Sequence, residues 1–275
     1  MRRQAFATAL VAATALALAF LALPIAAVFL RVSPGHLFAQ LGNPVATDAL
    51  LVSLKTSAIA HVLVLVIGTP TAYLLATNRF PGRSLVLALI ELPLVLPPAV
   101  AGIALLAAFG RFGLLGGTVH ALGVGIPFTQ AAVILAVAFV EAPFYIGGGI
   151  AAFEAVDRNL LDAARTLGAG PARVFARVAV PLALGGLAAG SALALARGLG
   201  EFGATIIFAG SLQGVTQTLP LAIYAQLDAD FETALAIGAL FVLIGATVLV
   251  ALKVVPRWTR SASISLSRSV PSASS

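Results

Sequence analysis

Long blocks of apolar residues, separated by short polar segments, dominate this sequence. Each block is at least 20 residues long, and a helix of about that length crosses the roughly 30 Å of hydrocarbon in a bilayer. The blocks predict six membrane spans, at residues 6–30, 49–77, 85–109, 129–152, 178–209 and 232–255. A membrane β-barrel would instead show shorter segments of alternating polarity. The pattern therefore predicts an all-α integral membrane protein with six transmembrane helices.

Composition strengthens this prediction. Of the 275 residues, 60% are hydrophobic and 9% are charged, whereas a soluble domain carries about 25% charged residues. The first apolar run follows Met1, Arg2 and Arg3 and continues to Leu30. This run is longer than the roughly 7–15 apolar residues of a cleaved signal peptide. We therefore expect it to stay attached as the first span.

The basic residues are distributed unevenly among the segments that join the spans. If the N-terminus is cytoplasmic, the outside segments hold only Arg31 and Arg111. The inside segments hold Arg2, Arg3, Arg79, Arg83, Arg158, Arg165, Arg173, Arg177, Lys253, Arg257, Arg260 and Arg268. Because basic residues are retained on the cytoplasmic side, this pattern predicts a multi-pass protein with both termini in the cytoplasm. It also accounts for the net charge of +6 without any binding to nucleic acid.

The chain is expected to form one domain. No internal repeat is visible, and residues 1–260 read as a single transmembrane domain. Residues 261–275 are rich in serine and lack periodicity, so we expect a disordered cytoplasmic tail there. The glycines of Gly147–Gly149 and Gly186-x-x-x-Gly190 predict close packing between spans.

One cytoplasmic segment is longer than a connection requires. Asp157 is a suitable N-cap and Gly168 a suitable left-handed stop, so a short helix is predicted between them. Leu160, Ala164 and Leu167 would form an apolar stripe on this helix, and Arg158, Asp162 and Arg165 a charged one. Pro171 can begin a second helix, and Pro181 marks its junction with the next span.

Two interpretations of this segment follow from its spacing alone. It could lie at the membrane surface with its arginines against lipid headgroups. Alternatively, it could dock a partner protein, because the small side chains of Ala163 and Ala164 allow close approach.

A motif favours docking. Asp162-Ala163-Ala164, Gly168 and Val178-Ala179-Val180-Pro181 resemble the EAA motif of ABC importer permeases, which reads E-A-A, three residues, G, nine residues, I-x-L-P. The spacing matches throughout, with aspartate in place of glutamate. In that family the loop forms a coupling helix that sits in a groove of the ATPase subunit. The resemblance therefore implies the type I ABC importer permease fold.

Other segments resemble the molybdate permeases of that family and, more distantly, the sulfate permeases. These segments are Phe80–Arg83, Leu92–Pro98, Ala163–Gly170 and Gly200–Thr205. The resemblance implies import of an oxyanion, with molybdate preferred over tungstate or sulfate, across a bacterial or archaeal cytoplasmic membrane. It also implies a homodimer, a separate ABC ATPase subunit and an extracytoplasmic substrate-binding protein.

We expect no catalytic, metal or cofactor site in this chain. The only lysines are Lys55 and Lys253, and neither follows the G-x-x-x-x-G-K-[ST] frame of a phosphate-binding loop. There is no cysteine, and the histidines at 36, 61 and 120 are far apart in the sequence. ATP hydrolysis is therefore expected on a separate polypeptide.

Ionisable residues and prolines inside the spans are candidates for the translocation pathway. Arg197 and Glu201 lie four residues apart on one helix face. A mutually neutralised structural pair is the favoured interpretation, and the alternative is that Arg197 helps an oxyanion across. Pro97 and Pro98 prevent the third span from being one straight helix, and we expect this region to line a central cavity.

Two further polar residues inside the spans receive structural interpretations. Glu141 precedes Pro143, so we expect its carboxylate to satisfy backbone groups freed by the proline. His61 is expected to be a hydrogen-bonded packing residue.

Two other classes of transporter remain open. An ion-coupled secondary transporter would show an inverted repeat with paired broken helices, which we do not see, and would leave the motif unexplained. The other class that remains open is a passive channel.

Overall fold

The structure is a computed structural model that describes residues 2–40, 42–121, 123 and 125–267. Every regular element in these residues is a helix. The elements are α1 (Arg2–Arg31), α2 (Pro34–Gln40), α3 (Pro44–Thr77), α4 (Arg83–Val95), α5 (Pro98–Phe109), α6 (Gly116–Ala121), α7 (Gln130–Glu154), α8 (Arg158–Thr166), α9 (Pro171–Val174), the π-helical turn η1 (Phe175–Ala179), α10 (Val180–Leu199), α11 (Gly203–Ala209), α12 (Leu219–Gln226) and α13 (Phe231–Ser267).

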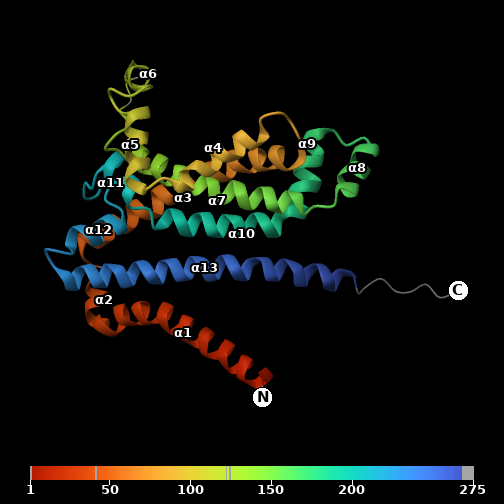
Figure 1. The fold of residues 1–275 in the computed structure, drawn as a ribbon. Coiled ribbons are helices and arrows are strands. Elements are labelled where there is room, and N and C mark those ends of the chain that lie inside the picture. The colour runs from red at the N-terminus through yellow and green to blue at the C-terminus, as the bar shows by residue number, and fades with distance from the viewer. Residues whose placement is uncertain (1, 41, 122, 124, 268–275) are drawn as a thin grey trace.

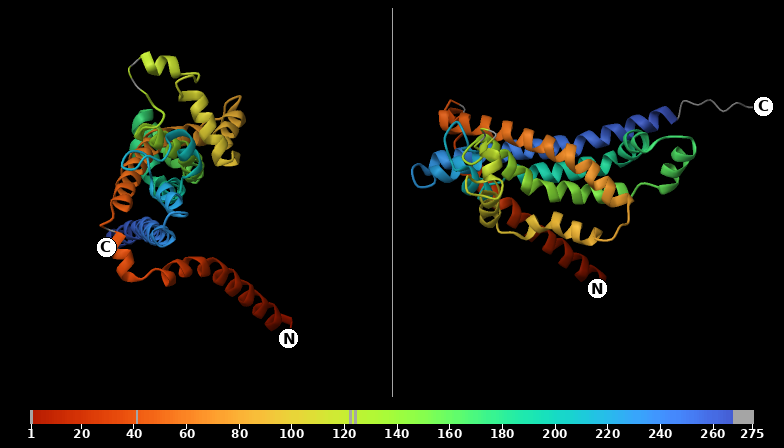
Figure 2. Two further views of the ribbon diagram at one scale, coloured as in Figure 1. Left: turned by 90° about the vertical axis from the view of Figure 1, so that its left-hand side faces the viewer. Right: turned by 90° about the horizontal axis from the view of Figure 1, so that it is seen from above.

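The centre of the molecule is a bundle of three long helices. Helix α7 packs against both α3 and α10, and the three run side by side (Figures 1 and 2). Helix α4 lies along α7, and α13 flanks α10. Five helices of the described chain are long and apolar enough to cross a membrane, and the number rises to six if the bent pair α4–α5 counts as one span. The prediction of an all-α membrane protein is confirmed, and these helices fit the six predicted spans on that count.

The third predicted span is broken at its prolines. The chain bends by 118° between α4 and α5. Leu96 and Pro97 each precede a proline and adopt extended backbone, as such residues prefer. Pro98 then begins α5 at a position that needs no amide donor. The prediction that the third span, at residues 85–109, cannot be one straight helix is confirmed.

The fifth predicted span also differs from its expected bounds of 178–209. The helical path is continuous from Pro171 to Leu199, and the π-helical turn η1 gives way to α10 at Val180, so the predicted junction at Pro181 is confirmed to within one residue. The π-helical turn η1 immediately before Pro181 accommodates a residue that cannot donate to the preceding turn. The helix then stops at Gly200, and the short helix α11 follows as a separate element.

Glycines bring α7 and α10 close together. A Cβ on Gly148 would lie 2.9 Å from Cα of Gly190, and one on Gly186 would lie 2.5 Å from Cβ of Ala152. Any side chain at Gly148 or Gly186 would therefore force α7 and α10 apart, as in other glycine-mediated contacts between membrane helices. The predicted close packing is confirmed, except that Gly147 faces open space.

Helix α1 lies apart from the bundle. It packs against α13, and the apolar window that could span the membrane is wholly exposed. The outer ends of α1 and α13 point toward the end of the bundle that carries α8 (Figure 1). Helix α13 continues to Ser267, beyond the predicted domain boundary at 260, so residues 261–267 are helical where a disordered tail was expected. Residues 268–275 of that tail lie outside the described residues.

Candidate functional site

Helix α8 has the two caps that its sequence predicts. The Asp157 side chain accepts a hydrogen bond from the amide of Asn159 at 2.9 Å. At the other end Gly168 has φ +82°. The amides of Gly168 and Ala169 donate to the carbonyls of Arg165 and Ala164, both at 3.0 Å. This pair of bonds is the Schellman arrangement, which closes a helix through a left-handed residue.

The faces of α8 differ from the predicted stripes. Leu161 is the buried side chain of this helix, and Ala164 is half-buried beside it. Leu160 and Leu167, which were predicted to share the stripe of Ala164, are 48% and 88% exposed. Ala163 is exposed as well. An outward surface of two leucines and small residues therefore remains uncovered on α8.

Two of the three residues of the predicted charged stripe on α8 form a surface ion pair. Arg165 Nη1 lies 2.7 Å from Asp162 Oδ1, with both side chains more than half exposed. An exposed pair of this kind contributes about 0–1 kcal/mol to stability. Its carboxylate and guanidinium therefore remain available to a partner.

The residues that follow α8 fix it to the bundle. Pro171 begins α9, as predicted, and Val174 is fully buried. The ring centroids of Phe175 and Tyr73, on α3, are 4.9 Å apart. Those of Tyr73 and Phe153, on α7, are 5.3 Å apart. We call residues 157–181 the docking segment. Its base is anchored by aromatic packing that sequence reasoning missed, because the three rings come from three distant stretches of chain.

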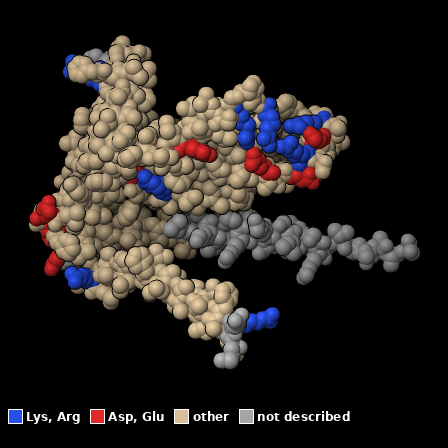
Figure 3. Space-filling model, in the orientation of Figure 1, with Lys and Arg blue, Asp and Glu red and all other residues tan. Residues whose placement is uncertain are grey.

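Charged residues gather around the docking segment. In Figure 3 most of the blue and red surface visible on this face lies over the end of the bundle that carries α8 and α9, and the middle is almost uncharged. Arg158, Arg173 and Arg177 are exposed at this end. The concentration of arginines matches the inside segments predicted from sequence.

A second candidate region lies where the fifth span breaks. Arg197 Nη1 is 3.0 Å from Glu201 Oε2, so the predicted pair forms, with the arginine 34% and the glutamate 1% exposed. The other carboxylate oxygen of Glu201 accepts from the amide of Ala204 at 2.7 Å. Glu201 therefore joins the end of α10 to the first turn of α11 and keeps the guanidinium at the break.

The two broken spans meet at this point. Helix α5 packs against α11, and Gly203 lies so close to Pro98 that a Cβ there would overlap the proline ring. A Cβ on Gly102 would lie 2.9 Å from the carbonyl oxygen of Ala204. Pro97 and Pro98 are exposed. The structure thus brings together the break at Pro97–Pro98 and the break that carries Arg197 and Glu201.

A buried polar cluster links the three central helices. Glu141 Oε2 on α7 lies 3.1 Å from His61 Nδ1 on α3, and His61 Nε2 lies 2.8 Å from Ser191 Oγ on α10. Glu141 is fully buried. The expectation that Glu141 serves backbone groups near Pro143 was wrong, because its recorded partner is a side chain on another helix. His61 is the hydrogen-bonded packing residue that was predicted.

The chain resembles known transport proteins. Residues 65–261 match the family described as "Binding-protein-dependent transport system inner membrane component". A Mycobacterium tuberculosis protein named "Molybdenum transport system permease protein ModB" is 46% identical over 229 residues, which cover 83% of this chain and 87% of that protein. The Escherichia coli K12 protein of the same name is 44% identical over 182 residues, covering 66% and 80% of the two chains.

The fold also resembles that of a solved structure. A chain of a bacterial ABC transporter involved in the import of the acidic polysaccharide alginate superposes with a TM-score of 0.77. The match covers 93% of this chain and 96% of the other, at 16% identity. At this identity the similarity concerns the fold alone.

Proposed function

This chain belongs to the family of inner membrane components of binding-protein-dependent transport systems, and we propose that it imports molybdate as the permease subunit of an ATP-driven importer. Family membership rules out the secondary transporter and the passive channel that the sequence left open. The choice of molybdate is supported by the names of the relatives that share 44–46% of their residues with it.

The docking segment is the observation that carries the coupling to ATP. We propose that a separate ABC ATPase subunit binds α8 through the motif residues Asp162, Ala163, Ala164, Gly168 and Pro181. Leu161 anchors the inner face of α8, whereas Leu160 and Leu167 leave apolar surface uncovered on its outer side. Apolar side chains held outward on a capped helix suit a partner groove.

The translocation pathway is proposed to pass the crossing of the two broken spans. Pro97 and Pro98 free backbone groups there, and irregular backbone at membrane depth is tolerated where it faces a cavity or protein. The partly exposed guanidinium of Arg197 would meet a passing oxyanion, and Glu201 would hold it in place. Since Glu201 neutralises Arg197, the permease would offer a path with little affinity of its own.

The assembly proposed is a homodimer with two ATPase subunits and an extracytoplasmic substrate-binding protein. The exposed apolar surface of α1 supports packing against a second copy, with lipid covering the rest. The gathering of arginines around α8 supports a cytoplasmic location for that end. The outer ends of α1 and α13 point toward that same end in Figure 1, and we propose that both termini are cytoplasmic.

Uptake into proteoliposomes tests this function. The permease, its ATPase and its binding protein are reconstituted, and molybdate, tungstate and sulfate are supplied in turn. We expect uptake of molybdate that requires both ATP and the binding protein. Uptake without ATP would contradict the proposal. A binding protein that prefers sulfate or tungstate would contradict the choice of anion but not the mechanism.

A further inference from the structure

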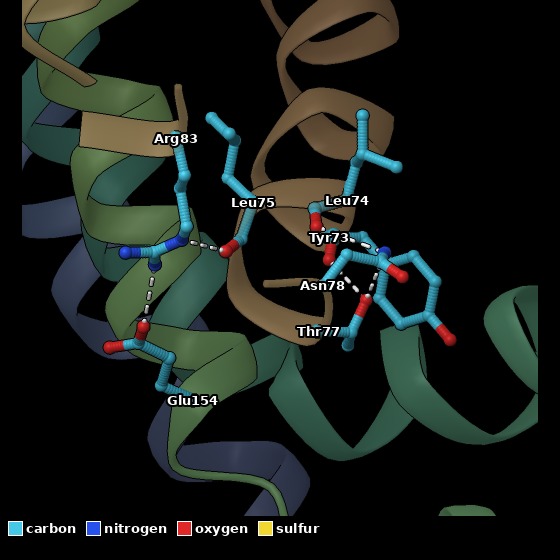
Figure 4. Close-up of polar contacts among 7 residues, drawn as sticks. All are labelled: Tyr73, Leu74, Leu75, Thr77, Asn78, Arg83 and Glu154. Carbon is cyan, nitrogen blue, oxygen red and sulfur yellow. Dashed lines mark hydrogen bonds and ion pairs between the residues drawn. The ribbon is translucent and has the colours of Figure 1, made fainter. Parts of the chain in front are cut away.

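One arginine joins three helices at the end of the bundle that carries α8. Arg83 Nε donates to the carbonyl oxygen of Leu75 at 2.8 Å, and its Nη2 donates to Glu154 Oε1 at 3.1 Å (Figure 4). Leu75 belongs to the last turn of α3, Arg83 is the first residue of α4, and Glu154 is the last residue of α7. The guanidinium thus bridges the ends of two helices from the start of a third.

The guanidinium satisfies a backbone group that the helix itself leaves without a partner. The last four carbonyls of a helix have no intrahelical donor, and a cation near a helix C-terminus is favourable. The neighbouring carbonyl of Leu74 has other donors, because the backbone and side-chain amides of Asn78 both donate to it. The planar guanidinium can serve the Leu75 carbonyl and the Glu154 carboxylate together, which a lysine ammonium cannot do with the same geometry.

Helix α4 has few other anchors. None of its residues is buried, and its contact with the core comes from the half-buried side chains of Val86, Leu87 and Ile90. Its far end leads through the break into α5, which packs against α11 beside Glu201. A shift of α4 is therefore resisted weakly along its length, and the contacts of Arg83 fix its first residue.

The same ion pair adjoins the docking segment. Only Ala155 and Val156 separate Glu154 from Asp157, the residue that caps α8, and Val156 is buried. A displacement of α8 would therefore be passed directly to Glu154. The Arg83–Glu154 ion pair thus joins two ends: the end of α7, which leads into α8, and the start of α4, the first half of the broken span.

We propose that the Arg83–Glu154 pair is a positioning contact that links the docking segment to the broken span α4–α5 during transport. This inference rests on the proposed function, because it assumes that an ATPase moves α8. When α8 moves, the Arg83–Glu154 pair makes the start of α4 move with it. ATP hydrolysis then changes the contact between Pro98 and Gly203. Without the pair, ATP is still hydrolysed, but fewer anions are imported for each ATP.

The test measures coupling rather than activity alone. The complete complex is reconstituted in proteoliposomes, and molybdate uptake and ATP hydrolysis are recorded in the same vesicles. The variants Arg83→Lys and Glu154→Gln retain side-chain volume and are expected to assemble as the unmodified chain does. Each should lower the ratio of molybdate imported to ATP hydrolysed by about two- to threefold, as expected for a pair whose carboxylate is 45% exposed.

Two comparisons make the result specific. Arg79→Lys is the matched control, because Arg79 is exposed in the same connection and takes part in none of the ion pairs recorded for the described chain; its ratio should not change. In the double variant Arg83→Lys/Glu154→Gln, the ratio of molybdate imported to ATP hydrolysed should be no lower than in the more affected single variant. Both substitutions act on the same contact.

Several outcomes would overturn the inference. These are an unchanged ratio in both single variants, an equal loss in Arg79→Lys, and losses that multiply in the double variant. Failure of the conservative variants to assemble would identify a purely structural contact and would also overturn it. An unmodified complex that hydrolyses ATP but imports no anion would instead contradict the proposed function.

Discussion

Alanine at position 168 is expected to weaken binding of the ATPase subunit, although its side chain would meet nothing. A Cβ built on Gly168 finds no heavy atom within 4 Å. The φ of +82°, however, lies in the left-handed region, where a Cβ approaches the following carbonyl oxygen. The substitution therefore perturbs only the backbone conformation of the turn that ends α8.

The size of the effect follows from this conformation. A non-glycine residue in the left-handed region costs about 1–2 kcal/mol, which lowers the population of the native turn relative to its alternatives by about 5- to 30-fold. The apparent Kd of a partner rises as the binding-competent fraction falls. The Kd for the ATPase should thus rise by up to that factor. Asparagine, which tolerates this region, should do less harm than alanine, and the β-branched valine more.

Gly170 provides a matched control two residues away. A Cβ there also meets nothing within 4 Å, but its φ is −66°, which any residue adopts. Gly170→Ala should leave the Kd unchanged. The assay is binding of labelled ATPase subunit to the purified permease, with membrane insertion measured alongside. Equal effects of Gly170→Ala and Gly168→Ala would refute the reasoning. Normal uptake by both Gly168→Val and Ala164→Asp would mean that this segment docks nothing.

Three further predictions concern topology, the pathway and packing. In this cysteine-free chain, Arg165→Cys should react with an impermeant thiol reagent only from the cytoplasm and Val215→Cys only from outside; the reverse would contradict the topology. Arg197→Ala should reduce assembly, because it leaves the charge of Glu201 unpaired. The double variant Arg197→Ala/Glu201→Gln should recover assembly. If this assembled double variant still transports no anion, Arg197 serves the translocation pathway. Gly198→Ala would place a Cβ 2.5 Å from Cδ of the buried Glu141 and should lower stability by about 1–3 kcal/mol, measured as Tm. Gly147→Ala, whose Cβ meets nothing within 4 Å, is its control, and an equal loss there would exclude the clash.

Features that depend on a short stretch of chain were predicted correctly. The spans follow from hydropathy because a helix in lipid must satisfy its own backbone and present apolar side chains. The caps of α8 follow because Asp157 and Gly168 act on amides and carbonyls within a few residues of themselves. The break at Pro97 and Pro98 follows from the missing amide donors of those residues.

Other features were decided by tertiary structure. The buried face of α8 could not be predicted from its apolar residues, since Leu160, Leu161 and Leu167 are equally apolar. Leu161 is the one that joins the core cluster to which Val174 also belongs. The break after Gly200 was missed because the apolar residues on both sides of Arg197 and Glu201 were assigned to one span.

The polar contacts between helices could not be predicted from the sequence. His61 and Glu141 are 80 residues apart, and Arg83 and Glu154 are 71 apart. Each residue alone is compatible with several partners, because the helix pattern fixes which residues share a face but not which face meets which neighbour. The close packing of α7 on α3, to which small residues such as Gly149 and Ala72 contribute, brings Glu141 to His61. Hydropathy thus determined the helices, and the packing of their small side chains determined which charged groups meet.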